Sequence, residues 1–353
     1  MDDFDEIATP SCGDSKIISF ADSHFAGCDR GEVFEELFLH ELDSWFSADI
    51  ACCDACYDAF VSQWPGIYLQ DIEFRENGWP LTAIYAGSRL SEVFSEAEFE
   101  ELLPHILCPA CGSPLQSNIW PYSLPFNVPE GFLERAGETE RIADNSPFLM
   151  LKNDFAREVF KQLEEISADV SAQRLVVAYF RARRSADVES VLPDRFAPPP
   201  AAVTSEGRYN HAGHPVLYLG DSIETCYHEL GRPPLGIIAA EVIVLQPMRV
   251  LDLRLAKLNN DIIEALVASS LLSSTVGEGL YHPAYTFSRF VADCLRYLTI
   301  DGLKYGSVRS GGAHNLVLFS RRRDWTGLYR IEKYWTYDGS VAREAVEGAN
   351  VHH

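Results

Sequence analysis

The sequence predicts an α+β protein in two parts: a mainly helical N-terminal domain held together by zinc, followed by a domain with a mixed sheet and helices. Two observations support this fold class. Two complete Cys-x-x-Cys pairs lie in the N-terminal third of the chain. From Arg174 onward, short runs of β-branched residues alternate with helical stretches, without the regular strand–helix–strand repeat that a doubly wound parallel sheet requires.

Length and composition indicate a globular protein that stays in the cytoplasm. A chain of 353 residues with 47% hydrophobic content can bury more than one core. No stretch reaches the roughly 18 uninterrupted apolar residues of a membrane span, and the first six residues are acidic where a secretory signal would be basic. Nine cysteines without an export signal favour reduced thiols and metal ligation over disulfide bonds.

The formal charge of −23 is concentrated in the first part of the chain. Residues 1–150 hold 28 acidic and 6 basic residues, whereas residues 151–353 hold 24 and 23. An acidic field repels phosphate backbones, so we do not expect direct nucleic-acid binding. We interpret the acidic part as a solubilising surface, with a docking face for a basic partner as the alternative. The nearly neutral second part suits a small anionic ligand better.

Helical spacing and capping signals organise the N-terminal part. Residues 1–30 lack periodicity and are expected to be a loose lead-in. The apolar residues between Glu32 and Phe60 recur at helical spacing, which predicts an amphipathic helix. A second helix is expected to begin at the capping box of Ser95. Residues 114–145 are rich in Pro, Gly and Asn, which is typical of a linker. We assign the acidic, zinc-binding accessory domain to residues 31–145.

The remaining chain is divided into a connecting helix, a second domain and an extension. A long helix from about Pro147 to Ser167 lies in the connecting segment 146–174. The second domain is assigned to residues 175–325 and the C-terminal extension to residues 326–353. β-Branched runs predict strands, and apolar periodicity predicts helices, at the following places in the second domain: strands at 175–180, 216–219, 236–244, 249–253 and 315–319, and helices at 222–230 and 284–299.

Four cysteines form two knuckles with the spacing of a structural zinc site. The knuckles are Cys53-Asp54-Ala55-Cys56 and Cys108-Pro109-Ala110-Cys111-Gly112, and the second has the CPxCG form of zinc ribbons. Four thiolates suit tetrahedral Zn²⁺ and leave no open coordination position, so the ion is expected to stabilise the fold rather than perform chemistry. Cys52 is adjacent to Cys53 and could replace it as a ligand.

The second domain contains several polar motifs in a specific order. The central run is Gly207-Arg208-Tyr209-Asn210-His211-Ala212-Gly213-His214-Pro215-Val216-Leu217-Tyr218-Leu219, followed by Ser222-Ile223-Glu224-Thr225 and Glu229. Phe180-Arg181-Ala182-Arg183-Arg184 precedes it, and the segments 301–309 and 315–319 close the domain. Over about 145 residues, this arrangement resembles the RES domain, a family named for its Arg, Glu and Ser residues.

The resemblance implies a fold like that of ADP-ribosylating toxins and a function in bacterial toxin–antitoxin systems. Proteins of this family deplete NAD⁺ by hydrolysis or phosphorolysis, so the resemblance implies NAD⁺ as substrate and an antitoxin or immunity protein as partner. By motif, the family's Glu corresponds to Glu229, its Ser to Ser307, its Tyr to Tyr218, and its Arg to Arg181 with Arg208 as a second. The N-terminal 150 residues lie outside the resemblance.

These residue types also make chemical sense for cleavage of the nicotinamide–ribose bond. Glu229 would stabilise the positive charge of an oxocarbenium-like ribosyl centre, as carboxylates do in glycoside hydrolysis. Arg181 and Arg208 would grip the pyrophosphate with their guanidinium groups. Tyr218 would stack on the nicotinamide ring, and Ser307 would bind the ribose or position the attacking water or phosphate. Two further residues of the motif segments are assigned to substrate binding: Arg183 and Asn210.

Two other functions remain open from the sequence. The same site would serve an ADP-ribosyltransferase that passes ADP-ribose to a protein or nucleic acid. A non-enzymatic interpretation makes the Cys-x-x-Cys domain the centre, as a zinc-ribbon interaction module with a degenerate second domain. The acidity of residues 1–150 argues against DNA binding in that second case.

Overall fold

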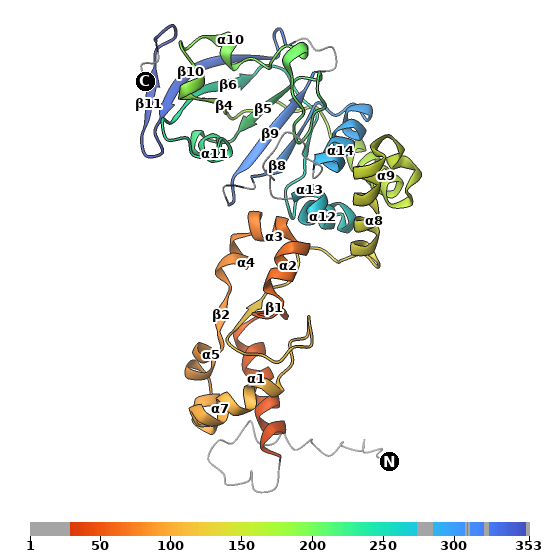
Figure 1. Ribbon diagram of the computed structural model, residues 1–353, viewed down its shortest axis with the longest axis vertical. Coiled ribbons are helices and arrows are strands. Elements are labelled where there is room, and N and C mark those ends of the chain that lie inside the picture. Colours follow the sequence, from red (N-terminus) through yellow and green to blue (C-terminus); the bar gives the residue numbers. More distant parts are fainter. Residues whose placement is uncertain (1–28, 274–284, 308, 310, 321–324, 351–353) are drawn as a thin grey trace, which may run out of the picture. The chain divides into compact units, whose positions relative to one another are not determined.

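The computed structural model describes residues 29–273, 285–307, 309, 311–320 and 325–350 (Figure 1). The chain divides into two compact units. The N-terminal unit consists of the chain up to Phe60 together with Glu73–Ser123, and the C-terminal unit consists of Val61–Ile72 together with the chain from Leu124 onward. Most of the expected lead-in lies outside the described residues.

The N-terminal unit is built on helix α1 and a small sheet. α1 begins after Asp29, whose carboxylate accepts hydrogen bonds from two backbone N–H groups of the first turn. The helix ends at Trp45, so the single helix expected up to Phe60 is wrong: Phe46 is extended, and strand β1 follows. The capping box of Ser95 is confirmed at the start of α7. Two of the helices in this unit, α2 and α4, cross the boundary between the units. The elements of the N-terminal unit are α1 Arg30–Trp45, β1 Ile50–Cys53, α2 Tyr57–Gln63, α4 Ile72–Glu76, β2 Trp79–Pro80, α5 Leu81–Gly87, α6 Leu90–Val93, α7 Glu96–Leu102 and β3 Asn118–Pro121.

The segment 114–145 is not a linker. Its first part contains β3, which pairs with both β1 and β2 in the order β1-β3-β2. Its last part forms α8, Phe132–Asn145. The buried residues of α8 recur at intervals of three and four, which is the spacing of one helix face: Phe132, Ala136, Thr139 and Ala143. The sequence signal failed because Pro, Gly and Asn are frequent only in the stretch before this helix.

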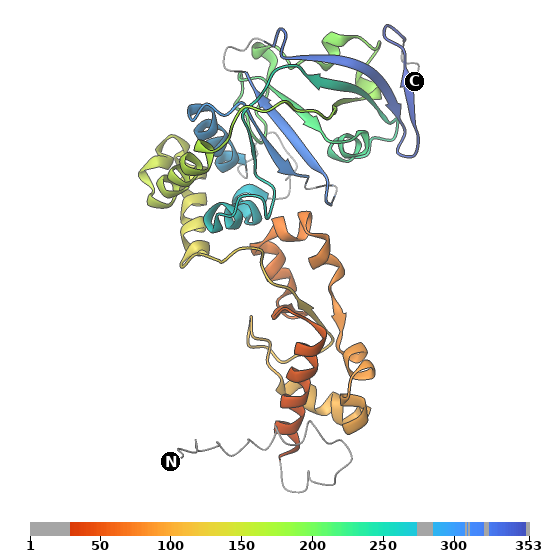
Figure 2. The ribbon, with the colours of Figure 1, turned by 180° about the vertical axis from the view of Figure 1, so that it is seen from behind.

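A group of helices lies beside the β7–β8 edge of the large sheet (Figures 1 and 2). The expected helix from Pro147 to Ser167 begins with a 3-10 turn up to Lys152 and continues as α9, which is capped by Asn153. α9 packs against α8, α12 and α14. The earlier segment α3 packs against α12 and α13 in the same unit. The bounds of these helices are α3 Pro65–Gln70, α9 Asp154–Ala168, α12 Asp261–Ala268, α13 Ser270–Ser273 and α14 Thr286–Tyr297.

An eight-stranded mixed sheet forms the centre of the C-terminal unit, which confirms the predicted α+β fold class. Its order is β11-β10-β6-β4-β5-β9-β8-β7, and every pair is antiparallel except β7 and β8. β10, which lies in the expected C-terminal extension, pairs with β6. The strands are β4 Tyr179–Arg184, β5 Val216–Gly220, β6 Ile237–Val244, β7 Val250–Asp252, β8 Gly302–Gly306, β9 His314–Phe319, β10 Tyr329–Tyr337 and β11 Ala342–Ala345.

Apolar side chains cover both faces of this sheet. Helix α11, Ile223–Glu229, packs on β4, β5 and β6 and covers one face through Cys226. Tyr179 and Leu316 belong to a core cluster on the other face. The short helix α10, Pro193–Phe196, packs on β4 and contributes Phe196 to the core. In the part of the chain that the structure describes, no helix combines the length and apolar character needed to cross a membrane.

Candidate active site and metal centre

A cavity of about 530 Å³ lies between β4 and β5. The two strands share only the pair Phe180–Gly220, so beyond that pair they are not joined by ladder hydrogen bonds. Four residues of each strand line the cavity, and residues from α11, the loop before β5, β8 and β9 complete it. Its volume lies within the range of about 300 to 1,000 Å³ that is usual for small-molecule sites. Five of the residues assigned from the sequence line it: Arg181, Arg183, Asn210, Tyr218 and Glu229.

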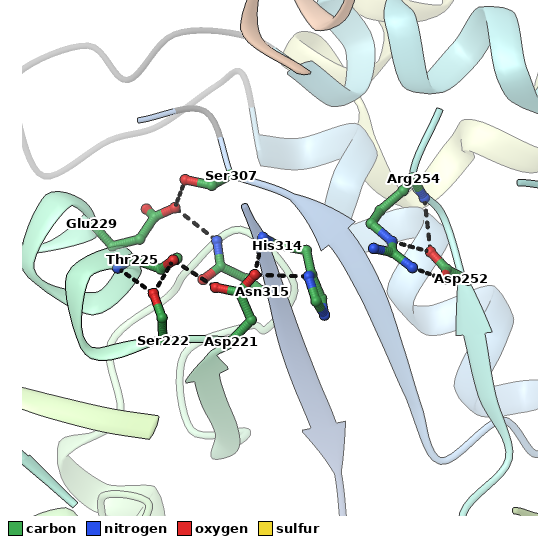
Figure 3. Close-up of polar contacts among 9 residues, drawn as sticks. All are labelled: Asp221, Ser222, Thr225, Glu229, Asp252, Arg254, Ser307, His314 and Asn315. Atoms are coloured by element: carbon green, nitrogen blue, oxygen red, sulfur yellow. Dashed lines mark hydrogen bonds and ion pairs between the residues drawn. The ribbon is translucent and has the colours of Figure 1, made fainter. Parts of the chain in front are cut away.

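Glu229 is held by two hydrogen-bond donors on one of its oxygens (Figure 3). Ser307 Oγ and Asn315 Nδ2 both donate to Glu229 Oε1, each at 2.7 Å. Ser307 follows β8 and Asn315 lies in β9, and both are buried. No described residue donates to the other oxygen, Oε2. The structure therefore brings together Glu229 and Ser307, which lie far apart in the sequence, and fixes the carboxylate at the cavity wall.

Two guanidinium groups from β4 give the cavity a cationic side. Arg181 Nη1 donates to the carbonyl of Tyr218 at 3.1 Å, and its Nε is buried without a hydrogen-bond partner in the described part of the chain. Burial, together with the nearby Arg183, lowers the pKa of Arg181 to about 9, so it keeps its charge at neutral pH. Neither arginine has a described carboxylate within salt-bridge distance, whereas Glu206 in the same lining pairs with Arg289 at 3.8 Å.

Tyr218 is fixed by the loop that precedes its strand. Its hydroxyl accepts a hydrogen bond from the backbone N–H of Tyr209 at 2.9 Å and donates to Asn210 Oδ1 at 3.0 Å. A Cβ at Gly207 would lie 2.6 Å from Asn210 Oδ1 and 3.0 Å from the Tyr218 hydroxyl. Only glycine therefore allows the loop to approach the tyrosine this closely.

Arg208 does not line this cavity. Its guanidinium donates to the backbone carbonyl of Leu272 and lies over the rings of Tyr209 and Tyr305, at 5.4 and 5.1 Å from the ring centroids. The sequence could not distinguish Arg208 from Arg181, because both belong to motifs of the same resemblance. The structure places Arg181 at the cavity and Arg208 behind Tyr305, which is itself part of the lining.

Two residues of the site were not assigned from the sequence: Asn315 and Tyr305. Asn315 begins a predicted strand and one of the motif segments, but the sequence gives it no role of its own, and its place next to Ser307 depends on the pairing of β8 with β9. An asparagine within an otherwise apolar run was the one available signal, because a buried amide needs partners. Tyr305 belongs to the motif segment 301–309; it is half-buried and packs against Tyr209, with ring centroids 4.7 Å apart.

The four predicted zinc ligands form a compact cluster in the N-terminal unit. The Sγ atoms of Cys53, Cys56, Cys108 and Cys111 all lie within 4.8 Å of one another. The recorded separations are 3.9 Å for Cys53–Cys56, 3.8 Å for Cys53–Cys111 and 3.9 Å for Cys56–Cys108. A tetrahedron of sulfurs at about 2.3 Å from a central zinc has edges of about 3.8 Å. The donor set and its spacing therefore fit a Zn²⁺ ion.

The backbone around the cysteines holds the two knuckles together. The carboxylate of Asp54, inside the first knuckle, accepts hydrogen bonds from the backbone N–H groups of Ser117 and Asn118, just after the second knuckle. The buried Cys52 is not a member of the sulfur cluster, which contains Cys53. Successive side chains of a strand point to opposite faces, and both cysteines lie in β1, so only one of them faces the other knuckle.

Comparison with known proteins assigns the C-terminal part of the chain to a known domain family. Residues 178–338 match the RES domain family. This part of the chain is a RES domain. A chain in the crystal structure of the M. tuberculosis MbcT–MbcA toxin–antitoxin complex is similar, with 16% sequence identity and a TM-score of 0.34, and the match covers 51% of this chain and 94% of that chain. No curated protein matches the sequence.

The RES domain contains the complete cavity lining, and it begins with β4 and ends after β10. It therefore includes all seven residues that the sequence assigned to catalysis and substrate binding. The cysteine cluster lies outside it.

Proposed function

We propose that the RES domain cleaves the bond between nicotinamide and ribose in NAD⁺. In this reaction the C1′–N bond breaks, its electron pair neutralises the pyridinium nitrogen of nicotinamide, and an oxygen of water or phosphate bonds to C1′ while releasing a proton. The acceptor decides whether the enzyme is a glycohydrolase or a phosphorylase. Depletion of NAD⁺ would harm the cell that makes the protein, so the proposal includes a role as toxin or defence effector and an antitoxin or immunity protein that restrains it.

The observation that supports this proposal best is the arrangement of Glu229. A carboxylate at the wall of a cavity stabilises positive charge that develops on a ribosyl carbon. Ser307 and Asn315 both donate to Oε1, so the orientation of the carboxylate is fixed before substrate binds and Oε2 can face the substrate. Nicotinamide leaves as a neutral ring, so the site needs no strong general acid, and a single carboxylate with fixed orientation is sufficient.

The cationic side of the cavity supports a substrate with a pyrophosphate. Arg181 and Arg183 lie two residues apart on β4, and no carboxylate among the described residues pairs with either of them. Burial of unpaired charge is costly unless an anion neutralises it. In the proposal these two side chains bind the pyrophosphate, and Tyr218 stacks on the nicotinamide ring. Arg208 supports the wall behind Tyr305 instead of contacting the substrate.

We also propose that the cysteine cluster binds one Zn²⁺ with a structural role. Four sulfurs complete the tetrahedral coordination of the ion, so no position remains for a substrate or an activated water. The ion would cross-link β1 with the knuckle that precedes β3, and so stabilise the N-terminal unit. The chemistry of the RES domain does not require it.

Product analysis tests the proposed function directly. Purified full-length protein is incubated with NAD⁺ in buffer with and without phosphate, and the products are separated and identified. Release of nicotinamide with ADP-ribose identifies a glycohydrolase, and a phosphorylated ADP-ribose that appears only with phosphate identifies a phosphorylase. Nicotinamide release that requires an added protein or nucleic-acid acceptor would identify an ADP-ribosyltransferase. Intact NAD⁺ under all three conditions would contradict the proposal.

A further inference from the structure

A second polar network lies beside Glu229 and joins helix α11 to strand β9 (Figure 3). Its centre is Asp221, in the turn between β5 and α11. Asp221 Oδ2 accepts two hydrogen bonds from His314, one from the backbone N–H at 2.9 Å and one from Nδ1 at 2.8 Å. The backbone N–H of Asp221 in turn donates to the carbonyl of His314 at 3.1 Å. The turn and the first residue of β9 are therefore held by three hydrogen bonds.

The other oxygen of Asp221 holds the helix. Thr225 Oγ1 donates to Asp221 Oδ1 at 2.5 Å, and the Thr225 side chain is buried. Ser222 separately caps the helix, because its Oγ accepts a hydrogen bond from the backbone N–H of Thr225 at 3.0 Å. The hydroxyls of Ser222 and Thr225 also contact each other, with their oxygens 2.8 Å apart. The bond from Thr225 to Asp221 can still be distinguished from the cap, because Ser222 holds the backbone N–H of Thr225 and Asp221 holds its hydroxyl.

The geometry of α11 connects this network to the candidate catalytic carboxylate. Thr225 and Glu229 are four residues apart, so they lie on the same face of the helix, one turn from each other. His314 and Asn315 are neighbours in β9, with side chains on opposite faces of the sheet. α11 is therefore attached to the same end of β9 twice, through Asp221 and His314 near its start and through Glu229 and Asn315 at its end.

We propose that Asp221, acting through Thr225 and His314, is a positioning residue that sets the location of Glu229 in the cavity. This inference rests on the proposed function, in which Glu229 is the catalytic carboxylate. A helix of only seven residues, attached at both ends, cannot rotate or slide relative to β9 without breaking one of the two attachments. A displacement of a catalytic group by about 1 Å can reduce a rate about 100-fold, so the attachment near Thr225 matters for turnover.

The decisive variant is Thr225→Val, with Thr225→Ser and Ser222→Ala as controls. Valine has the shape of threonine but cannot bond to Asp221 or to the Ser222 hydroxyl. The helix α11 therefore loses its first attachment, while the cap from Ser222 Oγ to the backbone N–H at position 225 remains. Serine keeps the hydroxyl and restores the attachment. Ser222→Ala removes the cap and the contact with the Thr225 hydroxyl but leaves the Asp221–Thr225 hydrogen bond in place, so it measures the effect of a weakened helix end without loss of the attachment.

We expect kcat to fall in the variant that lacks the Asp221–Thr225 hydrogen bond. A variant that only weakens the end of the helix should keep its kcat. Thr225→Val should lower kcat about 10- to 100-fold with KM for NAD⁺ within about twofold of wild type, because substrate contacts are unchanged. Thr225→Ser should stay within about threefold of wild-type kcat. Ser222→Ala should keep wild-type kcat even where its melting temperature falls. Wild-type kcat for Thr225→Val, or equal losses for Thr225→Val and Ser222→Ala, would overturn the inference.

A second measurement distinguishes failure of this inference from failure of the proposed function. In protein labelled with ¹⁵N on asparagine, the side-chain amide of Asn315 reports its hydrogen bond to Glu229 in the absence of any reaction. Thr225→Val should shift or broaden this resonance, and Ser222→Ala should leave it unchanged. If wild type does not cleave NAD⁺, the proposed function fails while this readout still decides the positioning. An unchanged resonance in Thr225→Val would show that Asp221 does not position Glu229.

Discussion

Ser307 Oγ donates a hydrogen bond to Glu229 Oε1 at 2.7 Å, although 78 residues separate the two along the chain. The contact forms because the end of β8 and the end of α11 meet at the same cavity. Its consequence is that the carboxylate keeps a fixed orientation before substrate binds, which is the condition for electrostatic stabilisation of a developing positive charge.

Glu229→Gln should reduce turnover of NAD⁺ about 10²- to 10³-fold. Glutamine keeps the volume of the side chain and one hydrogen-bond acceptor, but it removes the charge opposite the ribosyl centre, a loss of about 3 to 4 kcal/mol of transition-state stabilisation. Nicotinamide release is measured on variants with wild-type melting temperature. Glu224→Gln, an exposed position in the same helix, is the matched control and should retain full activity. Near-normal turnover of Glu229→Gln would show that its role is structural.

Substitution of Arg181 should weaken NAD⁺ binding, whereas substitution of Arg208 should lower the stability of the fold. Arg181→Ala should raise KM for NAD⁺ about tenfold or more with a smaller effect on kcat, because a residue that binds pyrophosphate contributes to ground state and transition state alike. Arg208→Lys should lower the melting temperature and leave KM close to wild type, because its guanidinium contacts the Leu272 carbonyl and two tyrosine rings instead of the cavity. Steady-state kinetics and thermal unfolding on the same samples test the pair. A rise in KM for Arg208→Lys as large as that for Arg181→Ala would contradict the assignment.

Purified protein should contain about one zinc per chain and should lose thermal stability when the metal is chelated. The cluster offers a sharp control, because Cys52 is buried next to it without belonging to it. Metal analysis of Cys52→Ser should still find one zinc per chain, whereas Cys108→Ser should lose the metal. Loss of zinc from Cys52→Ser alone would mean that the ligand set is wrong, and absence of zinc from fresh, reduced wild-type protein would contradict the site itself.

Gly66→Ala should destabilise the C-terminal unit by about 1 to 3 kcal/mol. A Cβ at this position in α3 would lie 2.7 Å from both the Ala268 Cα and the Val267 carbonyl oxygen, and backbone atoms cannot move aside as a flexible side chain can. The free energy of unfolding is measured by denaturant titration, with Gly137→Ala as control. Gly137 lies in α8, where no described atom other than those of its chain neighbours and its own helix backbone is within 4 Å of an added Cβ, so alanine there should be neutral or stabilising. Equal effects of the two substitutions would contradict the close packing of α3.

Asp221→Asn should make the melting temperature less sensitive to acid. Burial raises the pKa of Asp221, but hydrogen bonds from His314 and Thr225 outweigh it and hold the pKa in the folded protein below its ordinary value. A carboxyl of this kind stabilises the fold above its unfolded pKa of about 3.9, and the stabilisation is lost as pH falls through the lower, folded pKa. The difference in melting temperature between wild type and Asp221→Asn should therefore shrink below about pH 4. A constant difference from neutral to acidic pH would exclude this contribution.

The sequence predicted those features that depend on local pattern or on ordered motifs. The capping box of Ser95 and the pairing of the two cysteine knuckles follow from spacing, the strand at 216–219 follows from residue type, and each agrees with the structure. The meeting of Glu229 with Ser307 agrees with their membership in one ordered set of motifs.

Features that depend on distant pairing were not predictable in the same way. Asn315 became a partner of Glu229 only through the pairing of β9 with β8. Arg208 and Arg181 have the same chemistry, and only the path of the chain separates the one at the cavity from the one behind Tyr305. Helix α8 was missed because the turn-forming residues that precede it dominate the composition of its segment.

The docking of α3 against α12 and α13 sets an order of events during synthesis. Gln70 in α3 lies within hydrogen-bonding distance of Ser273, 203 residues later in the chain. At translation rates of about 5 to 20 residues per second, the partner of α3 leaves the ribosome roughly 10 to 40 seconds after α3 itself. The N-terminal unit, to which α3 does not belong, can fold during that interval. The RES-containing unit can gain its full packing only near the end of translation, so the part of the chain that holds the candidate active site is the last to mature.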